Sequence, residues 1–281
     1  MAASSGSGRQ GYVLTERSAQ VVAAVKLKRQ VGRRRARQFL AEGANLVEAA
    51  SARGLVRDIF VTELARTRHE PLLTSLAAAQ HGLIHLVTER AAKALSDTVT
   101  PVGLVAVCDM PATRLKDVLT DSPELIVVAV AISEPGNAGT IIRIADAMGA
   151  AAVILAGHSV DPYNGKCLRA SAGSFFSIPI VVAPETHTTI TALHGAGLQV
   201  LATAVDGETP LSADDQLLRK STAWLFGPES HGLPAEVLDA SDYRVRIPMA
   251  GGAESLNVAA AAAICLYQSA RALGCLTKQG G

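Results

Sequence analysis

The chain has 281 residues, of which 49% are hydrophobic and 18% charged; this is a globular composition, long enough for two domains. Its longest apolar run, 258–267, has about half the length that a membrane-spanning helix requires, and the first eleven residues contain no apolar stretch typical of a signal peptide. The four cysteines form no C-x-x-C pair and have no histidine at metal-binding spacing. We therefore expect a reduced, metal-free, cytoplasmic protein.

Positive charge is concentrated near the amino terminus. Residues 1–41 hold nine Lys or Arg and one acid, whereas the remainder holds 17 basic and 24 acidic residues. Seven of the twelve residues in 26–37 are cationic, and such a segment attracts nucleic acid through counterion release. The alternative is a solubilising tail or an expression-related extension. We predict nucleic-acid contacts from the following residues: Arg33, Arg34, Arg35 and Arg37.

A first domain is predicted at residues 16–108, after a flexible tail at 1–15. We expect an amphipathic helix at 34–50 and a second helix at 88–97. Strands are expected at 56–62, 83–87 and 102–108. This alternation indicates a small α/β domain. The polar segment 109–123 carries two prolines and is predicted to be a linker.

A second domain is predicted at residues 124–281. It contains six apolar, strand-like runs with helix-like segments in most of the gaps, at 125–132, 151–156, 178–183, 198–205, 222–227 and 243–248. Such alternation predicts an open, mostly parallel α/β sheet. Ligands of these sheets bind beyond the carboxyl ends of the strands, so we expect functional residues directly after them.

The first such loop, "SEPGNAGTIIRIADAMGA", follows the first of these runs. Asn137 is placed to cap the coming helix, whose apolar residues recur on one face. Arg143 lies off that apolar stripe and is a candidate for chemistry. The alternative is a surface ion pair with Asp146, three residues further along the helix.

The second loop, "GPESHGLP", places Glu229 between Gly227 and Gly232. Glycines there would let a ligand approach the backbone closely, although a lone Glu in a loop is more often solvated. Ser230 and His231 suggest a hydrolase, but the G-x-S-x-G elbow is absent.

The third loop, "IPMAGGAESLNV", offers Ser255 and Asn257 before a helix of small apolar residues. Ser255 could simply cap that helix, but the Glu of a capping box is absent because Val258 stands three residues on. No G-x-G-x-x-G follows the first strand and no P-loop is present, which argues against a Rossmann dinucleotide site, an ordinary Rossmann-type methyltransferase and a P-loop NTPase.

Together the three loops resemble the motifs of the SpoU family of RNA ribose 2′-O-methyltransferases, which belongs to the SPOUT superfamily. The motif "P-x-N-x-G-x-I-x-R-x-A" stands at 135–145, "G-x-E-x-x-G-L" at 227–233 and "I-P-M-x-G-x-x-E-S-L-N-V" at 247–258. The resemblance covers about 124–273. Glu134 stands where the family more often has Asp.

The amino-terminal part resembles the substrate-binding domain often fused to these enzymes, which is similar to ribosomal protein L30e. The similarity rests on "RRRARQFLAEGANLVEAA" and on "TPVGLVAV", where the family usually shows T-P-Q-G. Val102 therefore departs from the family pattern.

The resemblance implies a mostly parallel α/β fold with a carboxy-terminal trefoil knot, S-adenosylmethionine as cofactor and a homodimer formed through the knotted domain. It implies a cofactor pocket lined by Thr203, Gly227, Ile247 and Leu256. The implied catalytic cluster comprises Asn137, Arg143, Glu229, Ser255 and Asn257. Arg169 resembles a family position that meets RNA; its alternative is a solvated helix residue.

The implied activity is methylation of a ribose 2′-hydroxyl in ribosomal RNA, with 23S rRNA favoured because the amino-terminal domain resembles an RNA-binding ribosomal protein. Similar enzymes include thiostrepton-resistance methyltransferases, which modify 23S rRNA. Methylation of tRNA and an inactive RNA-binding role in ribosome assembly are the alternatives. The family's suggested base is the Arg of the first motif, but a guanidinium stays protonated in proteins. We therefore expect Arg143 to clamp a phosphate and Glu229 or a water to accept the proton, while Ser255 and Asn257 orient the sugar.

Overall fold

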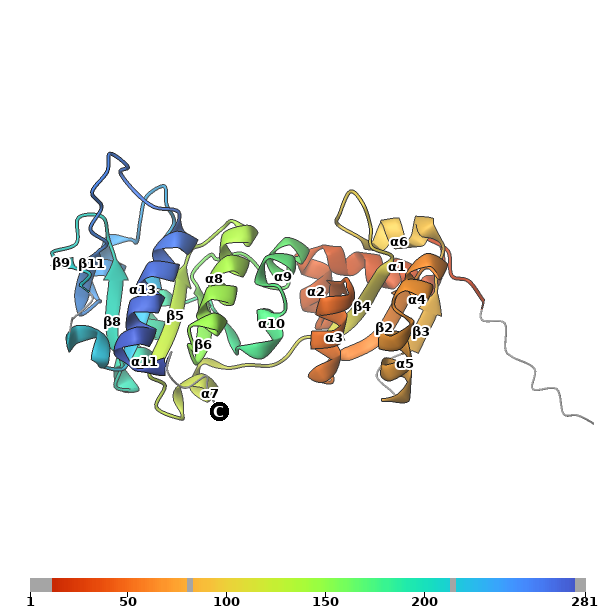
Figure 1. The fold of residues 1–281 in the computed structure, drawn as a ribbon, viewed down its shortest axis with the longest axis horizontal. Coiled ribbons are helices and arrows are strands. Elements are labelled where there is room, and N and C mark those ends of the chain that lie inside the picture. Colours follow the sequence, from red (N-terminus) through yellow and green to blue (C-terminus); the bar gives the residue numbers. More distant parts are fainter. Residues whose placement is uncertain (1–11, 80–82, 213–215, 276–281) are drawn as a thin grey trace, which may run out of the picture. The chain divides into compact units, whose positions relative to one another are not determined.

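The computed structural model describes residues 12–79, 83–212 and 216–275. The chain divides into two compact units, Met1–Met110 and Pro111–Gly281. Each unit contains one sheet with helices packed against it (Figure 1).

The first unit contains a four-stranded sheet in the order β1-β4-β2-β3. Its strands are β1 (Gln38–Glu42), β2 (Val56–Val61), β3 (Leu83–Leu86) and β4 (Leu104–Asp109). β2 and β3 run parallel, while β4 is antiparallel to both β1 and β2. The helices are α1 (Ala19–Val25), η1 (Lys26–Lys28), α2 (Gln30–Ala36), α3 (Ala44–Ala52), α4 (Glu63–Arg68), α5 (Glu70–Ala78) and α6 (Glu89–Leu95).

The single helix predicted at 34–50 is wrong, because strand β1 occupies its centre. Phe39 and Ala41 are buried and alternate with half-buried neighbours, which is the two-residue period of a strand. The chain leaves α2 through Arg37, at φ 55°, and enters α3 through Gly43, at φ 96°. These two left-handed positions turn the backbone out of and back into helix.

The ends of the first unit also differ from the predicted boundaries. Most of the predicted tail, 1–15, lies outside the described residues, but Leu14 is buried and forms a parallel bridge with Val87. The folded unit therefore begins earlier than predicted. Within the predicted linker 109–123, Asp109 ends β4 and a short helix, α7 (Leu115–Leu119), belongs to the second unit.

The second unit contains a seven-stranded sheet in the order β7-β6-β5-β10-β8-β11-β9, and every pairing is parallel. All six predicted strands are confirmed, and the short edge strand β9 is additional. The strands are β5 (Leu125–Val130), β6 (Ala152–Ala156), β7 (Ile180–Ala183), β8 (Gln199–Thr203), β9 (Thr209–Pro210), β10 (Thr222–Phe226) and β11 (Tyr243–Arg246).

Helices cover both faces of this sheet. One face packs against α7, α11 (Thr186–Gly195) and α12 (Ala235–Asp239). On the other face α8 (Pro135–Ala147) and α13 (Val258–Ala272) lie side by side (Figure 1). The predicted apolar stripe of α8 is confirmed, since Ala138, Ile141, Ile142 and Ala145 are fully buried. The remaining helices are α9 (Gly165–Ser171), α10 (Ser174–Ser177) and η2 (Gln216–Arg219).

A buried hydrogen bond fastens α13 to the centre of the sheet. Trp224 on β10 donates from Nε1 to Oγ of Ser269 at 2.8 Å, and both side chains are fully buried. Because a buried N–H without an acceptor is costly, this bond fixes the position of α13 relative to β10.

Replacing Ser269 with alanine should therefore lower the free energy of unfolding by about 1–3 kcal/mol. Trp224 is the only tryptophan of the chain, so its fluorescence in a urea titration reports on this unit. Ser177→Ala, at an exposed position, is the matched control. An unchanged urea midpoint for Ser269→Ala would show that the bond contributes nothing measurable.

Candidate active site

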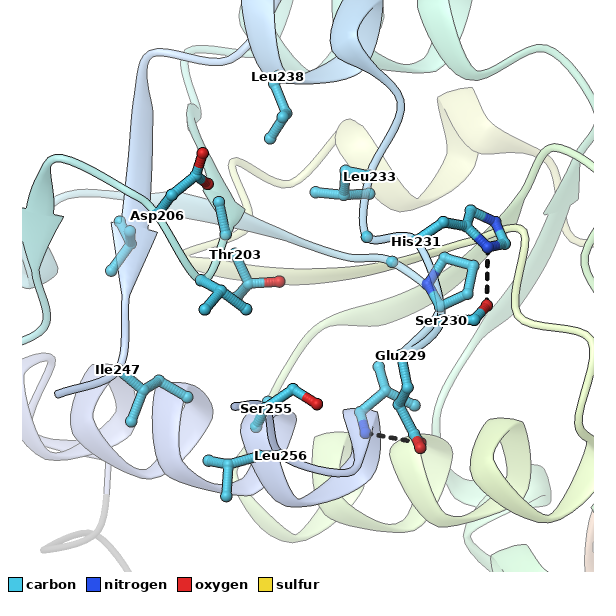
Figure 2. Close-up of a pocket in the computed structure, with 18 of the residues that line it drawn as sticks. Thr203, Asp206, Glu229, Ser230, His231, Leu233, Leu238, Ile247, Ser255 and Leu256 are labelled. Carbon is cyan, nitrogen blue, oxygen red and sulfur yellow. Dashed lines mark hydrogen bonds between the residues drawn. The ribbon is translucent and has the colours of Figure 1, made fainter. Parts of the chain in front are cut away.

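A cavity of about 450 Å³ opens at the carboxyl ends of β8, β10 and β11. Its walls come from the loops that follow these three strands and from the start of α13. All four residues predicted to bind the cofactor line it: Thr203, Gly227, Ile247 and Leu256. Figure 2 shows Thr203, Ile247 and Leu256 around the cavity. The four residues that the resemblance implies for the cofactor thus lie around one cavity, and their contact with the cofactor stays a prediction.

Glu229 connects the three predicted loops. Its Oε1 accepts hydrogen bonds from Asn137 Nδ2 at 3.1 Å, from Asn257 Nδ2 at 2.7 Å and from the backbone N–H of Val258 at 3.0 Å. Asn257 Nδ2 also donates to Oδ1 of Asn137 at 3.1 Å. One carboxylate oxygen thus holds the starts of α8 and α13 together. Glu229 lies at the wall of the cavity (Figure 2).

The cap prediction for α8 is wrong. Glu134, not Asn137, caps α8, and its Oε1 accepts from the backbone N–H of Gly136 at 3.0 Å. The Lys166 ammonium, 2.6 Å away, and the Gly136 N–H hold the pKa of Glu134 below its ordinary value. Asn137 is the third residue of α8, so its side chain is left for the contacts with Glu229 and Asn257.

Asn257, not Ser255, is the cap of α13. Its Oδ1 accepts from the backbone N–H groups of Ala259 and Ala260 at 3.0 and 3.4 Å. Both Nδ2 and Oδ1 of Asn257 therefore form hydrogen bonds within the protein, which disfavours the predicted direct contact with a sugar. Ser255 is exposed and lines the cavity, as a substrate-orienting residue would require.

Arg143 and Arg169 neither line the cavity nor take part in the hydrogen bonds around Glu229. Arg143 is exposed on α8, and among the described residues it forms no ion pair with Asp146. Arg169 is exposed on α9 and is also outside the pocket lining. A substrate that reaches either side chain must therefore extend beyond the cavity.

The glycine at position 227 is required by the loop itself. A Cβ built there would lie 2.7 Å from the carbonyl carbon of Gly232 and 2.7 Å from the backbone N of Leu233. Gly232 has φ +66° and donates from its N–H to the carbonyl of Pro228 at 2.9 Å. The loop thus folds back on Gly227, which the sequence prediction had assigned to ligand approach.

Replacing Gly227 with alanine should displace the 228–232 loop and with it Glu229. We expect about a tenfold or greater loss of cofactor affinity, measured by calorimetry, because shifts of about 1 Å at a preorganised site have effects of this order. Gly195→Ala, where an added Cβ meets nothing within 4 Å, is the matched control. Unaltered affinity in Gly227→Ala would contradict the tight packing of this loop.

Several pocket residues were not predicted to bind the cofactor. Asp206 follows β8 by three residues, and Ser230 and His231 follow Glu229. Ser230 Oγ lies 2.7 Å from His231 Nδ1, a pairing of neighbours with no carboxylate partner for the ring among the described contacts. Asp206 could have been predicted as a pocket residue from its position just beyond a parallel strand.

Three of the four cysteines are buried and unsuited to nucleophilic chemistry. Burial raises the pKa of Cys167 to about 12 and also raises the pKa of Cys108 and Cys265. Within the described ranges no group of three His, Cys, Asp or Glu could hold a metal ion. Over the same residues, no helix has the length and apolar character needed to cross a membrane.

The predicted basic segment forms η1, α2 and the turn that follows. Arg34, Arg35 and Arg37 are exposed. Arg33 is only 4% exposed, and its Nη1 donates to the carbonyls of Leu27 and Lys28 at 3.0 and 2.9 Å. Arg33 therefore stabilises the end of η1, and the prediction that it contacts RNA is withdrawn.

The fold and the site together define a two-unit α/β protein with a ligand pocket at the ends of parallel strands. Residues 124–267 match the SpoU rRNA methylase family, and residues 19–106 match the MRM3-like substrate-binding domain. The chain belongs to the SpoU rRNA methylase family.

Curated relatives and solved structures agree with this membership. A 23S rRNA (guanosine(2553)-2′-O)-methyltransferase of Bacillus subtilis is 36% identical over 86% of this chain and 92% of its own length. A 23S rRNA (uridine(2479)-2′-O)-methyltransferase of Streptomyces viridochromogenes is 35% identical over 85% of this chain and 84% of its own. An AdoMet-bound rRNA methyltransferase from Sinorhizobium meliloti superposes with a TM-score of 0.80 and 32% identity, covering 93% of this chain and 98% of that one.

Proposed function

We propose that the protein transfers the methyl group of S-adenosylmethionine to a ribose 2′-hydroxyl of ribosomal RNA, with 23S rRNA as the substrate. The observation that carries the proposal is the carboxylate of Glu229, which lines the pocket while Asn137, Asn257 and Val258 hold one of its oxygens. The named 23S rRNA relatives and the substrate-binding domain at residues 19–106 support the choice of RNA.

The pocket suits an adenosyl cofactor. Ile247, Leu256 and Leu233 offer apolar surface for a purine, and Asp206 and Glu229 offer negative charge for a cation. Thr203 donates its hydroxyl to the carbonyl of Leu225 at 3.0 Å, so its contribution to the pocket is mainly shape. When bound, the cofactor supplies a methyl group activated by a positively charged sulfur.

The residues of the chain then align and deprotonate the sugar. Alignment of the 2′-oxygen with the methyl carbon can supply about 7–11 kcal/mol of barrier reduction. Ser255 orients the ribose, and the second carboxylate oxygen of Glu229 takes the hydroxyl proton, directly or through a water. Asn137 and Asn257 are positioning residues, because their amides hold the first oxygen.

RNA contacts beyond the pocket are assigned to exposed arginines. The guanidinium fork of Arg143 matches a phosphate, as does that of Arg169. In the amino-terminal unit, which we propose as the RNA substrate-binding domain, Arg34, Arg35 and Arg37 supply sequence-independent attraction. Ribosomal RNA as substrate implies a cytoplasmic location.

We also propose that the carboxy-terminal part of the chain forms a trefoil knot and that the unit forms a homodimer. In support of the knot, β11 lies on one side of β10 in the sheet, and β5 and β6, which α8 connects, lie on the other side. After β11 the chain crosses back, and α13 packs against α8. Support for the dimer comes from Ile264 and Tyr267 of α13, which are 37% and 46% exposed. Light scattering of the purified protein tests the dimer.

The proposed function is tested by incubating the protein with tritiated methyl donor and unmodified 23S rRNA, 16S rRNA or bulk tRNA. We expect label in 23S rRNA. Labelling of tRNA alone would replace the substrate assignment, and cofactor binding without labelling of any RNA would favour the inactive RNA-binding alternative.

A further inference from the structure

The described side chains that line the pocket give it a negative charge. Asp206 and Glu229 both line it, and no Lys or Arg does so in the described part of the chain. Asp206 lies beside Thr203, across the cavity from Glu229 (Figure 2). A cation held in the cavity is therefore attracted from two sides, whereas a neutral ligand is not.

Asp206 is held in place by the turn that carries it. The N–H of Gly207 donates to the carbonyl of Ala204 at 3.3 Å, closing a tight turn after β8. A Cβ on Gly207 would lie 2.7 Å from the carbonyl oxygen of Arg244, so this turn packs directly on the backbone of β11. The turn therefore keeps the backbone of Asp206 at the rim of the pocket.

Arg244, which lies on the strand that this turn packs against, does not neutralise Asp206. The guanidinium of Arg244 pairs with Asp239 at 2.6 Å. Among the described residues no ion pair to Asp206 is formed, so its charge is available to a ligand.

We propose that Asp206 selects the positively charged methyl donor over the neutral demethylated product. This inference rests on the proposed function. The donor carries a sulfonium, an ammonium and a carboxylate, a net charge of +1, whereas the product carries a thioether in place of the sulfonium and is neutral overall. The attraction of Asp206 for the sulfur position is thus lost on methyl transfer, which favours exchange of product for fresh donor.

The alternative role for Asp206, recognition of the cofactor's ribose hydroxyls, predicts a different ratio of donor and product affinities. A carboxylate at a nucleoside pocket can accept hydrogen bonds from ribose hydroxyls, and these hydroxyls are identical in donor and product. Loss of that contact weakens both ligands equally. The ratio of the two dissociation constants therefore separates charge selection from hydroxyl recognition.

The test is calorimetry of the full chain with S-adenosylmethionine and with S-adenosylhomocysteine. Asp206→Asn removes the charge and keeps the shape, and Asp121→Asn, at an exposed position outside the pocket, is the matched control. We expect the preference for the donor to fall by about threefold to tenfold in Asp206→Asn and to stay unchanged in Asp121→Asn. Raising the salt concentration should reduce the wild-type preference more than that of Asp206→Asn.

An unchanged ratio in Asp206→Asn, with both affinities lowered or neither, overturns the inference and leaves the proposed function intact. Failure of the wild-type chain to bind either ligand refutes the proposed cofactor and the inference with it. The melting temperature of Asp206→Asn, an exposed position, should match that of the wild type and so confirms that the variant is folded.

Discussion

Replacing Glu229 with glutamine should lower the methylation rate by about 100-fold to 10,000-fold, the usual contribution of a positioned base. The glutamine carbonyl can still accept from Asn137, Asn257 and the N–H of Val258. Its amide nitrogen cannot accept the hydroxyl proton. Because the framework is preserved, we expect the donor's dissociation constant to rise by no more than about tenfold, the effect of the removed charge alone.

Two further variants identify the cause of the loss. Glu229→Ala removes both oxygens, so we expect it to lower the melting temperature in addition to the rate. Glu236→Gln, an exposed carboxylate on α12 outside the pocket lining, should behave as the wild type. A fully active Glu229→Gln enzyme would show that the proton leaves by another route and that Glu229 acts only through its hydrogen bonds.

Replacing Arg143 with alanine should lower methylation by about 100-fold or more while cofactor affinity stays nearly intact. The side chain projects from α8 outside the pocket lining, so it can meet RNA but not a ligand held in the cavity. Lysine at this position should restore little activity, because an ammonium cannot reproduce the two-pronged contact with a phosphate.

The methylation rate is measured from labelled RNA retained on a filter, and cofactor affinity is measured by calorimetry. Arg219→Ala, which replaces an exposed arginine of the same unit, is the control. An equal loss of methylation and cofactor affinity in Arg143→Ala would contradict the phosphate clamp. It would instead place Arg143 at the cofactor.

The position of the site could be predicted from sequence without knowledge of the order of the strands in the sheet. Polar residues after buried parallel strands reach the same sheet edge, and Asn137, Glu229 and Asn257 do meet there. Their partners could not be predicted. Asn137 is released for Glu229 only because Glu134 caps α8, and Glu134 is itself held by Lys166, 32 residues away.

Predictions from the local sequence pattern were wrong where tertiary contacts determine the structure. The segment 34–50 has residues that favour a helix, yet pairing of Gln38–Glu42 with β4 makes part of it a strand. Arg33 was assigned to the surface because it stands in a basic run. Its burial depends on the carbonyls at the end of η1, which a one-dimensional pattern does not reveal.

A ribose oxygen is the proposed acceptor of the methyl group, and alkaline hydrolysis of tritium-labelled 23S rRNA is the decisive measurement. A 2′-O-methyl group blocks cleavage of the adjacent phosphodiester, so the label should appear in one alkali-resistant dinucleotide. In a reaction of equal time with Glu229→Gln, the label in this dinucleotide should be lower by about 100-fold or more. Label released as a methylated base or an ordinary mononucleotide would contradict the account, because the acceptor would then be a base atom.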